Sequence, residues 1–161
     1  IIEDKQFYLY DTFNGLDEKY SSQFEQVLSK TGTFDMPGIE AEVRKEFEHY
    51  KWIKVIRGIV PEILEIKAPK KIAFLHLDLN AGEAEIKALD FLFDRVTEGG
   101  IILLDDYGRI EHNELFCNHN NWFAKKGYRI LELPTGQGMV VKRKIINLEE
   151  KIKCADMEST H

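Results

Sequence analysis

The pattern of apolar and polar positions predicts strands and helices that alternate along the chain. Short β-prone runs bounded by turn residues predict strands, and they cover Gln6–Tyr10, Trp52–Ile56, Ile72–Leu79, Ile101–Leu104, Tyr128–Leu133 and Met139–Lys144. Apolar residues at helical spacing predict helices, and they cover Asp17–Lys30, Glu40–Tyr50, Val60–Leu64, Glu83–Val96 and Glu111–Lys126. In the first of these helices, Phe24, Val27 and Leu28 share one face. The most apolar strand, Ile72–Leu79, is expected to lie centrally with both faces covered.

This alternation predicts an α/β fold, built on a mostly parallel sheet with right-handed crossovers. Only Pro134–Gly138 joins the last two strands, which is too short for a crossover, so they should form an antiparallel hairpin. Glu98-Gly99-Gly100 is expected to end the Glu83–Val96 helix. We expect one domain over residues 1–148 and a polar, frayed tail over 149–161.

Composition and charge narrow the function classes. The chain has 161 residues, of which 43% are hydrophobic and 31% charged, as in an ordinary soluble domain with one core. The net charge of −6 gives no basic footprint for nucleic acid and disfavours anionic membranes. The two cysteines, Cys117 and Cys154, lack CxxC spacing, and the simplest expectation is a reducing cytoplasm. No apolar run approaches the roughly 20 residues that span a bilayer.

Acidic residues stand where two of the predicted strands end. Asp105 and Asp106 follow Ile101–Leu104, and Asp78 lies at the end of the Ile72–Leu79 run. An open α/β sheet places its ligands outside the carboxyl ends of its strands, and divalent cations such as Mg²⁺ prefer oxygen ligands. The three carboxylates are therefore a candidate metal site. Alternatively, Asp106 caps a turn and Asp78 caps the helix that follows.

Other candidate residues have two interpretations each. Asp11 ends the first strand, where an acid can accept hydrogen bonds from ribose hydroxyls or make an Asx-turn with Thr12 and Phe13. His76 points to the same side of its strand as Asp78, although a histidine in an apolar strand is more often a core residue. Leu133–Gly138 is either a simple hairpin turn or a glycine-rich segment that allows backbone to approach a ligand closely.

Five motifs occur in order between Phe7 and Lys144, and together they resemble a known family. They are Asp11-Thr12-Phe13-Asn14-Gly15-Leu16, Phe34-Asp35-Met36-Pro37, His76-Leu77-Asp78-Leu79-Asn80, Gly99-Gly100-Ile101-Ile102-Leu103-Leu104-Asp105-Asp106-Tyr107-Gly108 and Leu133-Pro134-Thr135-Gly136-Gln137-Gly138. The set is similar to the macrocin O-methyltransferase (TylF-related) family of class I S-adenosylmethionine-dependent methyltransferases.

The resemblance implies a Rossmann-like class I methyltransferase sheet and Mg²⁺-assisted methylation of a hydroxyl on a sugar or another natural-product-like small molecule. The implied metal ligands are Asp78, Asp105 and Asp106. Asp78 also falls near the implied cofactor site, whose remaining residues would be Asp11, Thr12, Phe13, Arg57, Gly58 and Ile59. Mg²⁺ would orient the acceptor oxygen and lower its pKa. A homodimer is also compatible with the resemblance.

The sequence departs from the family in its acid–base residue. Members with a D-x-D pattern use its second acid as the general base, and this chain has Asn80 there. An amide cannot take up a proton at neutral pH. Either His76 or His112 serves instead, or the metal-bound acceptor loses its proton to water, or this branch is altered in activity. In each case Asn80 is a candidate metal ligand or a residue that orients the acceptor.

The glycine-rich first strand of the family is the other departure, because no match for it precedes Phe7. We therefore expect the chain to be the C-terminal part of a class I fold, truncated at the N-terminus, and to bind S-adenosylmethionine weakly or not at all in calorimetry. Two alternatives remain. One is a catalytically silent interaction domain. The other is a Mg²⁺-binding receiver-type signalling domain, which would need the acidic pair on an early strand and a lysine after its last strand.

Overall fold

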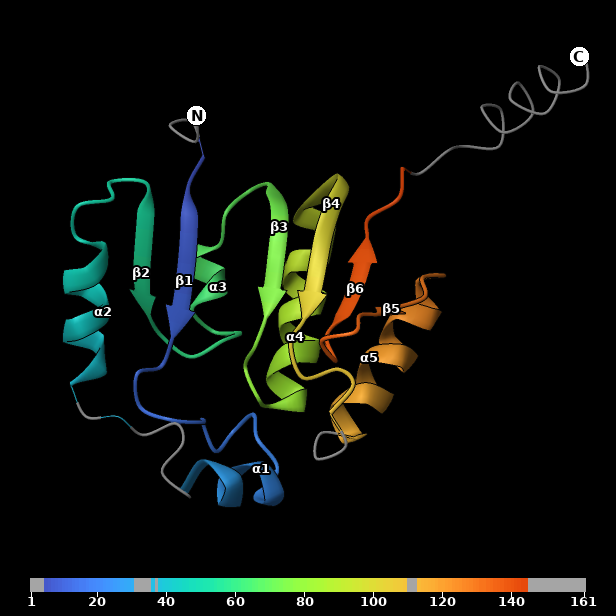
Figure 1. Ribbon diagram of the computed structural model, residues 1–161, viewed down its shortest axis with the longest axis horizontal. Coiled ribbons are helices and arrows are strands. Elements are labelled where there is room, and N and C mark those ends of the chain that lie inside the picture. The colour runs from blue at the N-terminus through green and yellow to red at the C-terminus, as the bar shows by residue number, and fades with distance from the viewer. Residues whose placement is uncertain (1–4, 31–35, 37, 110–112, 145–161) are drawn as a thin grey trace, which may run out of the picture.

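The computed structural model describes residues 5–30, 36, 38–109 and 113–144. Within them, the elements follow one another as β1 (Phe7–Asp11), α1 (Gln23–Leu28), α2 (Ile39–Phe47), β2 (Ile53–Arg57), α3 (Leu64–Lys67), β3 (Ile72–Leu77), α4 (Gly82–Leu92), the 3₁₀ turn η2 (Phe93–Arg95), β4 (Val96–Leu104), α5 (Asn113–Lys125), β5 (Leu131–Glu132) and β6 (Gly138–Val141). The labelled strands lie side by side in Figure 1, with α1 below them.

The strands form a parallel pair and a mixed four-stranded sheet. β1 pairs with β2 in parallel, and the larger sheet has the order β3-β4-β6-β5. β3 and β4 are parallel, whereas β6 runs antiparallel to β4 and to β5. The predicted α/β fold with a C-terminal antiparallel hairpin is therefore confirmed.

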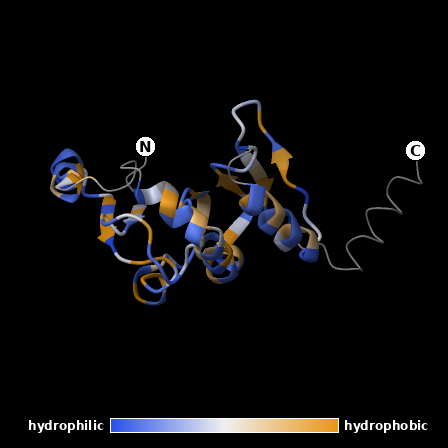
Figure 2. Cartoon of the chain, turned by 90° about the horizontal axis from the view of Figure 1, so that it is seen from below, coloured by the Kyte–Doolittle hydropathy of each residue, from blue (hydrophilic) through white to orange (hydrophobic). Residues whose placement is uncertain are grey.

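The core lies where α4 and α5 pack against the larger sheet. Leu89 of α4, Ile102 of β4 and Phe123 of α5 are fully buried in one cluster. Burial of such side chains contributes roughly 1.5–3 kcal/mol each. Figure 2 shows that the helices carry both hydrophobic and hydrophilic residues, as expected for helices that cover a sheet on one side.

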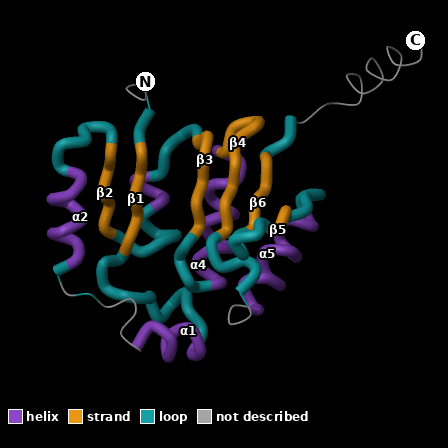
Figure 3. Tube along the Cα trace, in the orientation of Figure 1, coloured by secondary structure: helices purple, strands orange, loops and turns teal. Residues whose placement is uncertain are grey.

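Loops that follow parallel strands meet at one end of the molecule. In Figure 3 the chain leaves β1, β3 and β4 at the same end, and α1 lies near these loops. This arrangement brings together the segments that contain Asp11, Asp78 and Asp105, which is what the sequence predicted from their places at strand ends.

The expected central position of the Ile72–Leu79 strand is wrong for the described residues. There β3 pairs with β4 and no other strand, and Phe74 on β3 is 51% exposed. The buried core residues of β3 are Ile72 and Leu77, near its two ends, although Ala73, Phe74 and Leu75 between them are also apolar.

The predicted helix that contains Phe24 and Val27 is present but shorter than predicted. Its apolar face is not buried at these two side chains, which are 59% and 62% exposed. Among the α1 residues whose burial is described, Glu25 is buried, and it forms a capping box with Ser22. Its carboxylate turns inward because it accepts backbone N–H groups there, including that of Gly82 at 2.8 Å.

Gly99 and Gly100 do not end a helix. α4 stops at Leu92, and Val96 already belongs to β4, paired with Ile72. The two glycines lie inside β4 beside a register shift between Ile72 and Phe74, and Gly99 has a φ of +75°. A Cβ at Gly100 would lie 2.8 Å from the Thr97 carbonyl oxygen, so this irregular strand segment needs glycine.

Candidate functional site

Asp105 follows β4 and contacts both β3 and the hairpin before β6. Its backbone N–H donates to the Leu77 carbonyl oxygen at 3.0 Å, which continues the β3–β4 pairing beyond the strand ends. Its Oδ1 accepts a hydrogen bond of 2.6 Å from Gln137 Nε2 and lies 3.3 Å from His76 Nε2. The predicted acid at this strand end is thus tied to β3 and to the hairpin before β6.

His76, Asp78 and Asp105 form a cluster with ligand geometry. One donor atom from each lies within 4.8 Å of the others. The pKa of Asp78 is raised, first by partial desolvation of its carboxyl group and then by the negative charges of Asp105 and Asp106. A cation would relieve this crowding, so carboxylate oxygens of the cluster fit a hard divalent ion.

Asp106 points to a different partner. Its buried carboxylate lies 3.0 Å from Arg109 Nε, an ion pair within one turn of chain. The structure therefore groups His76, rather than Asp106, with the other two acids. The set of Asp78, Asp105 and Asp106 as metal ligands stays a prediction, and Asp106 is near enough to raise the pKa of Asp78.

Asn80 holds Asp78 through a hydrogen bond. Its Nδ2 donates to Asp78 Oδ1 at 3.0 Å, and its backbone has a φ of +53°, a left-handed conformation that asparagine tolerates better than most residues. A group that donates its amide hydrogen to the neighbouring acid orients that acid. The role that the sequence left open for Asn80, orienting the acceptor, stays a prediction.

Two buried carboxylates hold the loop that follows β3. Glu85 Oε1 accepts from Leu79 N at 3.1 Å, and Glu25 Oε1 accepts from Gly82 N. The other oxygen of Glu85 lies 2.9 Å from Nε2 of the buried His119. The sequence analysis missed this support, although Ser22-x-x-Glu25 has the spacing of a capping box.

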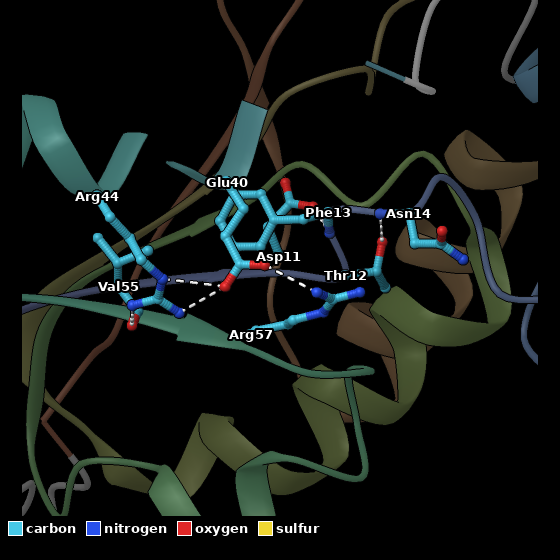
Figure 4. Close-up of polar contacts among 8 residues, drawn as sticks. All are labelled: Asp11, Thr12, Phe13, Asn14, Glu40, Arg44, Val55 and Arg57. Carbon is cyan, nitrogen blue, oxygen red and sulfur yellow. Dashed lines mark hydrogen bonds and ion pairs between the residues drawn. The ribbon is translucent and has the colours of Figure 1, made fainter. Parts of the chain in front are cut away.

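The Asp11 segment forms the turn that the sequence allowed. Asp11 Oδ1 accepts from Phe13 N at 2.7 Å, and Thr12 Oγ1 accepts from Asn14 N at 3.2 Å (Figure 4). The Thr12 hydroxyl also donates to the Gly15 carbonyl oxygen at 2.6 Å. The Asx-turn is therefore present, and it fixes the Asp11 carboxylate at the end of β1.

Arg57 takes part in an ion-pair network outside this turn. Its Nη1 lies 2.8 Å from Glu40 Oε2, and Arg44 binds the other oxygen of Glu40 at 2.8 Å (Figure 4). Hydrogen bonding to Arg44 is the main cause that lowers the pKa of Glu40, and the charge of Arg57 contributes. Arg57 thus anchors α2 to the end of β2, while the next residues, Gly58 and Ile59, face a cavity.

This cavity joins the Asp11 turn to the cluster of His76, Asp78 and Asp105. It measures about 250 Å³ and opens between the ends of β1, β2 and β3. Asp78 is common to the cavity and the cluster. Of the residues predicted to bind a cofactor, Phe13 and Arg57 are outside the lining set. The lining residues include Tyr10, Asp11, Thr12, Leu16, Tyr20, Gly58, Ile59, Asp78, Leu79, Asn80 and Ala81.

The remaining predicted residue, His112, lies outside the described residues. Phe34, Asp35 and Pro37 of the second motif also lie outside them. None of the helices in the described ranges is both long and apolar enough to cross a membrane.

Comparison with known proteins gives a family match and several structural matches. The model of the macrocin-O-methyltransferase (TylF) family matches residues 1–124. The chain is similar to the solved structure of the O-methyltransferase NovP, with a TM-score of 0.73 and 17% identity, over 88% of this chain and 61% of that one.

Two structures of CalS11 also match. The one described as a calicheamicin methyltransferase has a TM-score of 0.63 at 18% identity, over 84% of this chain and 60% of that one. The apo structure, described as a TDP-rhamnose 3′-O-methyltransferase of calicheamicin biosynthesis, has a TM-score of 0.54 at 16% identity, over 84% and 58%. These likenesses support the fold, and the chain spans about three fifths of the length of the structures it matches. No curated protein sequence matches the chain.

Proposed function

The chain belongs to the TylF macrocin-O-methyltransferase family, and from this premise we propose that it acts as an S-adenosylmethionine-dependent O-methyltransferase. Its acceptor would be a hydroxyl of a sugar or a related natural product, in line with the descriptions of NovP and CalS11. We place the enzyme in the cytoplasm, as the cysteine usage suggested.

The observation that supports the proposal is that Asp78 belongs both to the cavity and to the cluster with His76 and Asp105. A methyltransferase must align the donor sulfonium, the methyl carbon and the acceptor oxygen. Asp78 lines the cavity that begins at the Asp11 turn, and it also belongs to the cluster with His76 and Asp105. A cofactor in the cavity and an acceptor at the cluster would therefore meet at this residue.

The residues that line the cavity would suit an adenosine moiety. The Asp11 carboxylate is fixed by its turn and would accept hydrogen bonds from ribose hydroxyls. Apolar side chains such as Ile59 and Leu79 also line the cavity and would suit a purine ring. Arg57, which is bound to Glu40, would act by fixing the segment that precedes Gly58.

Asp78 and Asp105 would hold Mg²⁺, with Asp106 as the third predicted ligand. The ion, when bound, supplies Lewis-acid polarisation of the acceptor oxygen. Because Mg²⁺ prefers oxygen ligands, the imidazole of His76 stays available for proton transfer. Asn80 would keep the Asp78 carboxylate oriented through its 3.0 Å hydrogen bond.

We assign proton uptake to His76. The acceptor oxygen attacks the methyl carbon, the carbon–sulfur bond breaks with its electrons left on sulfur, and the hydroxyl proton passes to the imidazole. Asp105, 3.3 Å away, stabilises the resulting positive charge. His112 remains an alternative base, because it lies outside the described residues.

A radiometric methyl-transfer assay tests this function. The purified protein is incubated with methyl-labelled S-adenosylmethionine, Mg²⁺ and a panel of nucleotide sugars. Transfer should occur with the wild type and fall by at least a hundredfold in Asp78→Asn, because both halves of the site lose their shared carboxylate. Transfer that survives unchanged in Asp78→Asn would contradict the proposed site.

A catalytically silent interaction domain is the second candidate. The observation that favours it is Asn80, whose amide occupies the position of the family's base and donates to Asp78. Absence of transfer to every sugar acceptor, with cofactor binding retained, would support this candidate. The family match leaves the receiver-type alternative without support.

A further inference from the structure

The turn between β5 and β6 packs against the loop that carries the acidic pair. Gly108 N donates to the Gly136 carbonyl oxygen at 2.7 Å, and Gly136 N closes the turn by donating to Leu133 O at 2.9 Å. The glycines of the Leu133–Gly138 motif therefore allow the backbone of this turn to lie close to the backbone of the loop that contains Gly108. The two loops form one unit at the edge of the site.

This approach depends on the absence of side chains at two positions. A Cβ at Gly108 would lie 3.0 Å from the Gly136 carbonyl oxygen, and a Cβ at Gly138 would lie 2.7 Å from Cγ of the buried Tyr107. Contacts this short are repulsive, so larger residues would push the turn away from Asp105. The close packing places Gln137 beside that carboxylate.

The Gln137 side chain is oriented at both ends. Thr135 Oγ1 donates to Gln137 Oε1 at 3.0 Å, which leaves Nε2 to donate to Asp105 Oδ1 at 2.6 Å. An ionised carboxylate can only accept, so the amide nitrogen must face Asp105, and the amide oxygen is left to accept from the Thr135 hydroxyl. A donor to an ionised carboxylate makes a stronger hydrogen bond than a neutral pair does.

We propose that Gln137 is a positioning residue that holds the Asp105 carboxylate in place for a divalent cation, with Thr135 fixing the Gln137 amide. The hydrogen bond to Oδ1 limits rotation of the carboxylate, whose Oδ1 also lies 3.3 Å from His76 Nε2 of the cluster. This inference rests on the proposed function, because it needs the acidic cluster to bind metal. Groups that orient metal ligands in this way commonly affect affinity tenfold to a hundredfold.

Calorimetric titration of the purified protein with Mg²⁺ alone tests the proposal. Gln137→Met keeps the length of the side chain and removes its amide, and it should weaken Mg²⁺ binding about tenfold or more. Thr135→Val should weaken binding by a smaller factor. The matched control is Gln26→Met in α1, which removes an amide whose contacts are with Glu18 and Ser21 and should leave the affinity unchanged.

The outcomes distinguish a failure of the metal site from a failure of the positioning role of Gln137. Equal Mg²⁺ affinities of the wild type and Gln137→Met overturn the positioning role and leave the proposed site intact. Absence of Mg²⁺ binding by the wild type overturns the metal site and, with it, the role of Gln137. If Gln137→Met fails to fold in circular dichroism, Thr135→Val alone decides, and an unchanged affinity there overturns the proposal.

Discussion

The ionised form of Asp78 is disfavoured by its surroundings in the site. Desolvation and the neighbouring acids raise its pKa above the usual value of 3.8, so the folded protein binds this proton more tightly than the unfolded chain does. The contribution of Asp78 to stability therefore falls as the pH rises from the unfolded pKa through the folded one. At neutral pH, without a cation, the ionised carboxylate destabilises the fold.

We predict that Asp78→Asn raises the melting temperature at pH 7 in the presence of a chelator. The neutral amide removes the repulsion with Asp105 and Asp106. The difference in melting temperature between the variant and the wild type should vanish at pH 3, because the wild-type carboxyl group is also neutral there. Differential scanning calorimetry at the two pH values measures this. A lower melting temperature of the variant at pH 7 would contradict the electrostatic account of the cluster.

His76 is predicted to act on the proton of the acceptor. His76→Gln should lower kcat about a hundredfold or more, as loss of a general base commonly does, with little change in S-adenosylmethionine affinity. The matched control is His49→Gln, because His49 is 84% exposed at the end of α2 and far along the chain from the cluster. If kcat falls equally in both variants, or falls in neither, a group other than His76 takes up the proton.

At the residue scale, the sequence identified the acids that lie at strand ends and missed what holds them. Asp78 and Asp105 could be predicted because parallel strands end at one edge. Gln137 and Glu25 make their contacts with Asp105 and Gly82 across 32 and 57 residues. Such contacts depend on the packing of separate elements, which local periodicity does not contain.

At the element scale, α1 is held to α4 by a side chain rather than by an apolar face. Glu25→Ala would leave the buried N–H group of Gly82 and the partly buried N–H group of Ser22 without their carboxylate partner. We predict a loss of roughly 1–3 kcal/mol in the free energy of unfolding from the buried group, with a smaller addition from Ser22. Urea denaturation measures it, with Glu46→Ala on exposed α2 as the control, expected within about 0.5 kcal/mol of the wild type.

The β5–β6 turn makes a second prediction about elements. Gly138→Ala should cost about 1–3 kcal/mol of stability, because its Cβ would meet Tyr107 and Ile130 at under 3 Å. Gly82→Ala is a suitable control, since its Cβ would meet a flexible Asn118 side chain at 3.2 Å. Urea midpoints that fall equally for both variants would show that the close approach at Gly138 is not special.

The Gly99-Gly100 pair shows why the boundaries of helices and strands were harder to predict than their types. Gly99 and Gly100 have the sequence features of a helix end, but they lie within β4. The strand bulges there to pair with β3 over a shifted register, and a bulge uses the same conformational freedom as a helix C-cap. Only the pairing partner, which is distant in sequence, distinguishes the two uses.

At the scale of the whole molecule, the sequence and the fold agree on the architecture of a class I methyltransferase. The parallel strands and the closing hairpin followed from the lengths of the connections. The position of β3 did not follow, because burial of a strand depends on the neighbours it has. In the described residues β3 pairs only with β4, so it is the edge strand of its sheet. The side chain of Phe74 on this strand is therefore left exposed.

The measurement that tests the central claim most directly is a titration of the ¹⁵N-labelled protein with S-adenosylhomocysteine, followed by NMR. It needs no knowledge of the acceptor and detects weak binding. We predict saturable shifts at millimolar ligand that centre on the amides of Thr12, Gly58 and Asp78, which surround the cavity. Shifts confined to another face of the molecule, or no shifts at millimolar ligand, would contradict the proposed cofactor site.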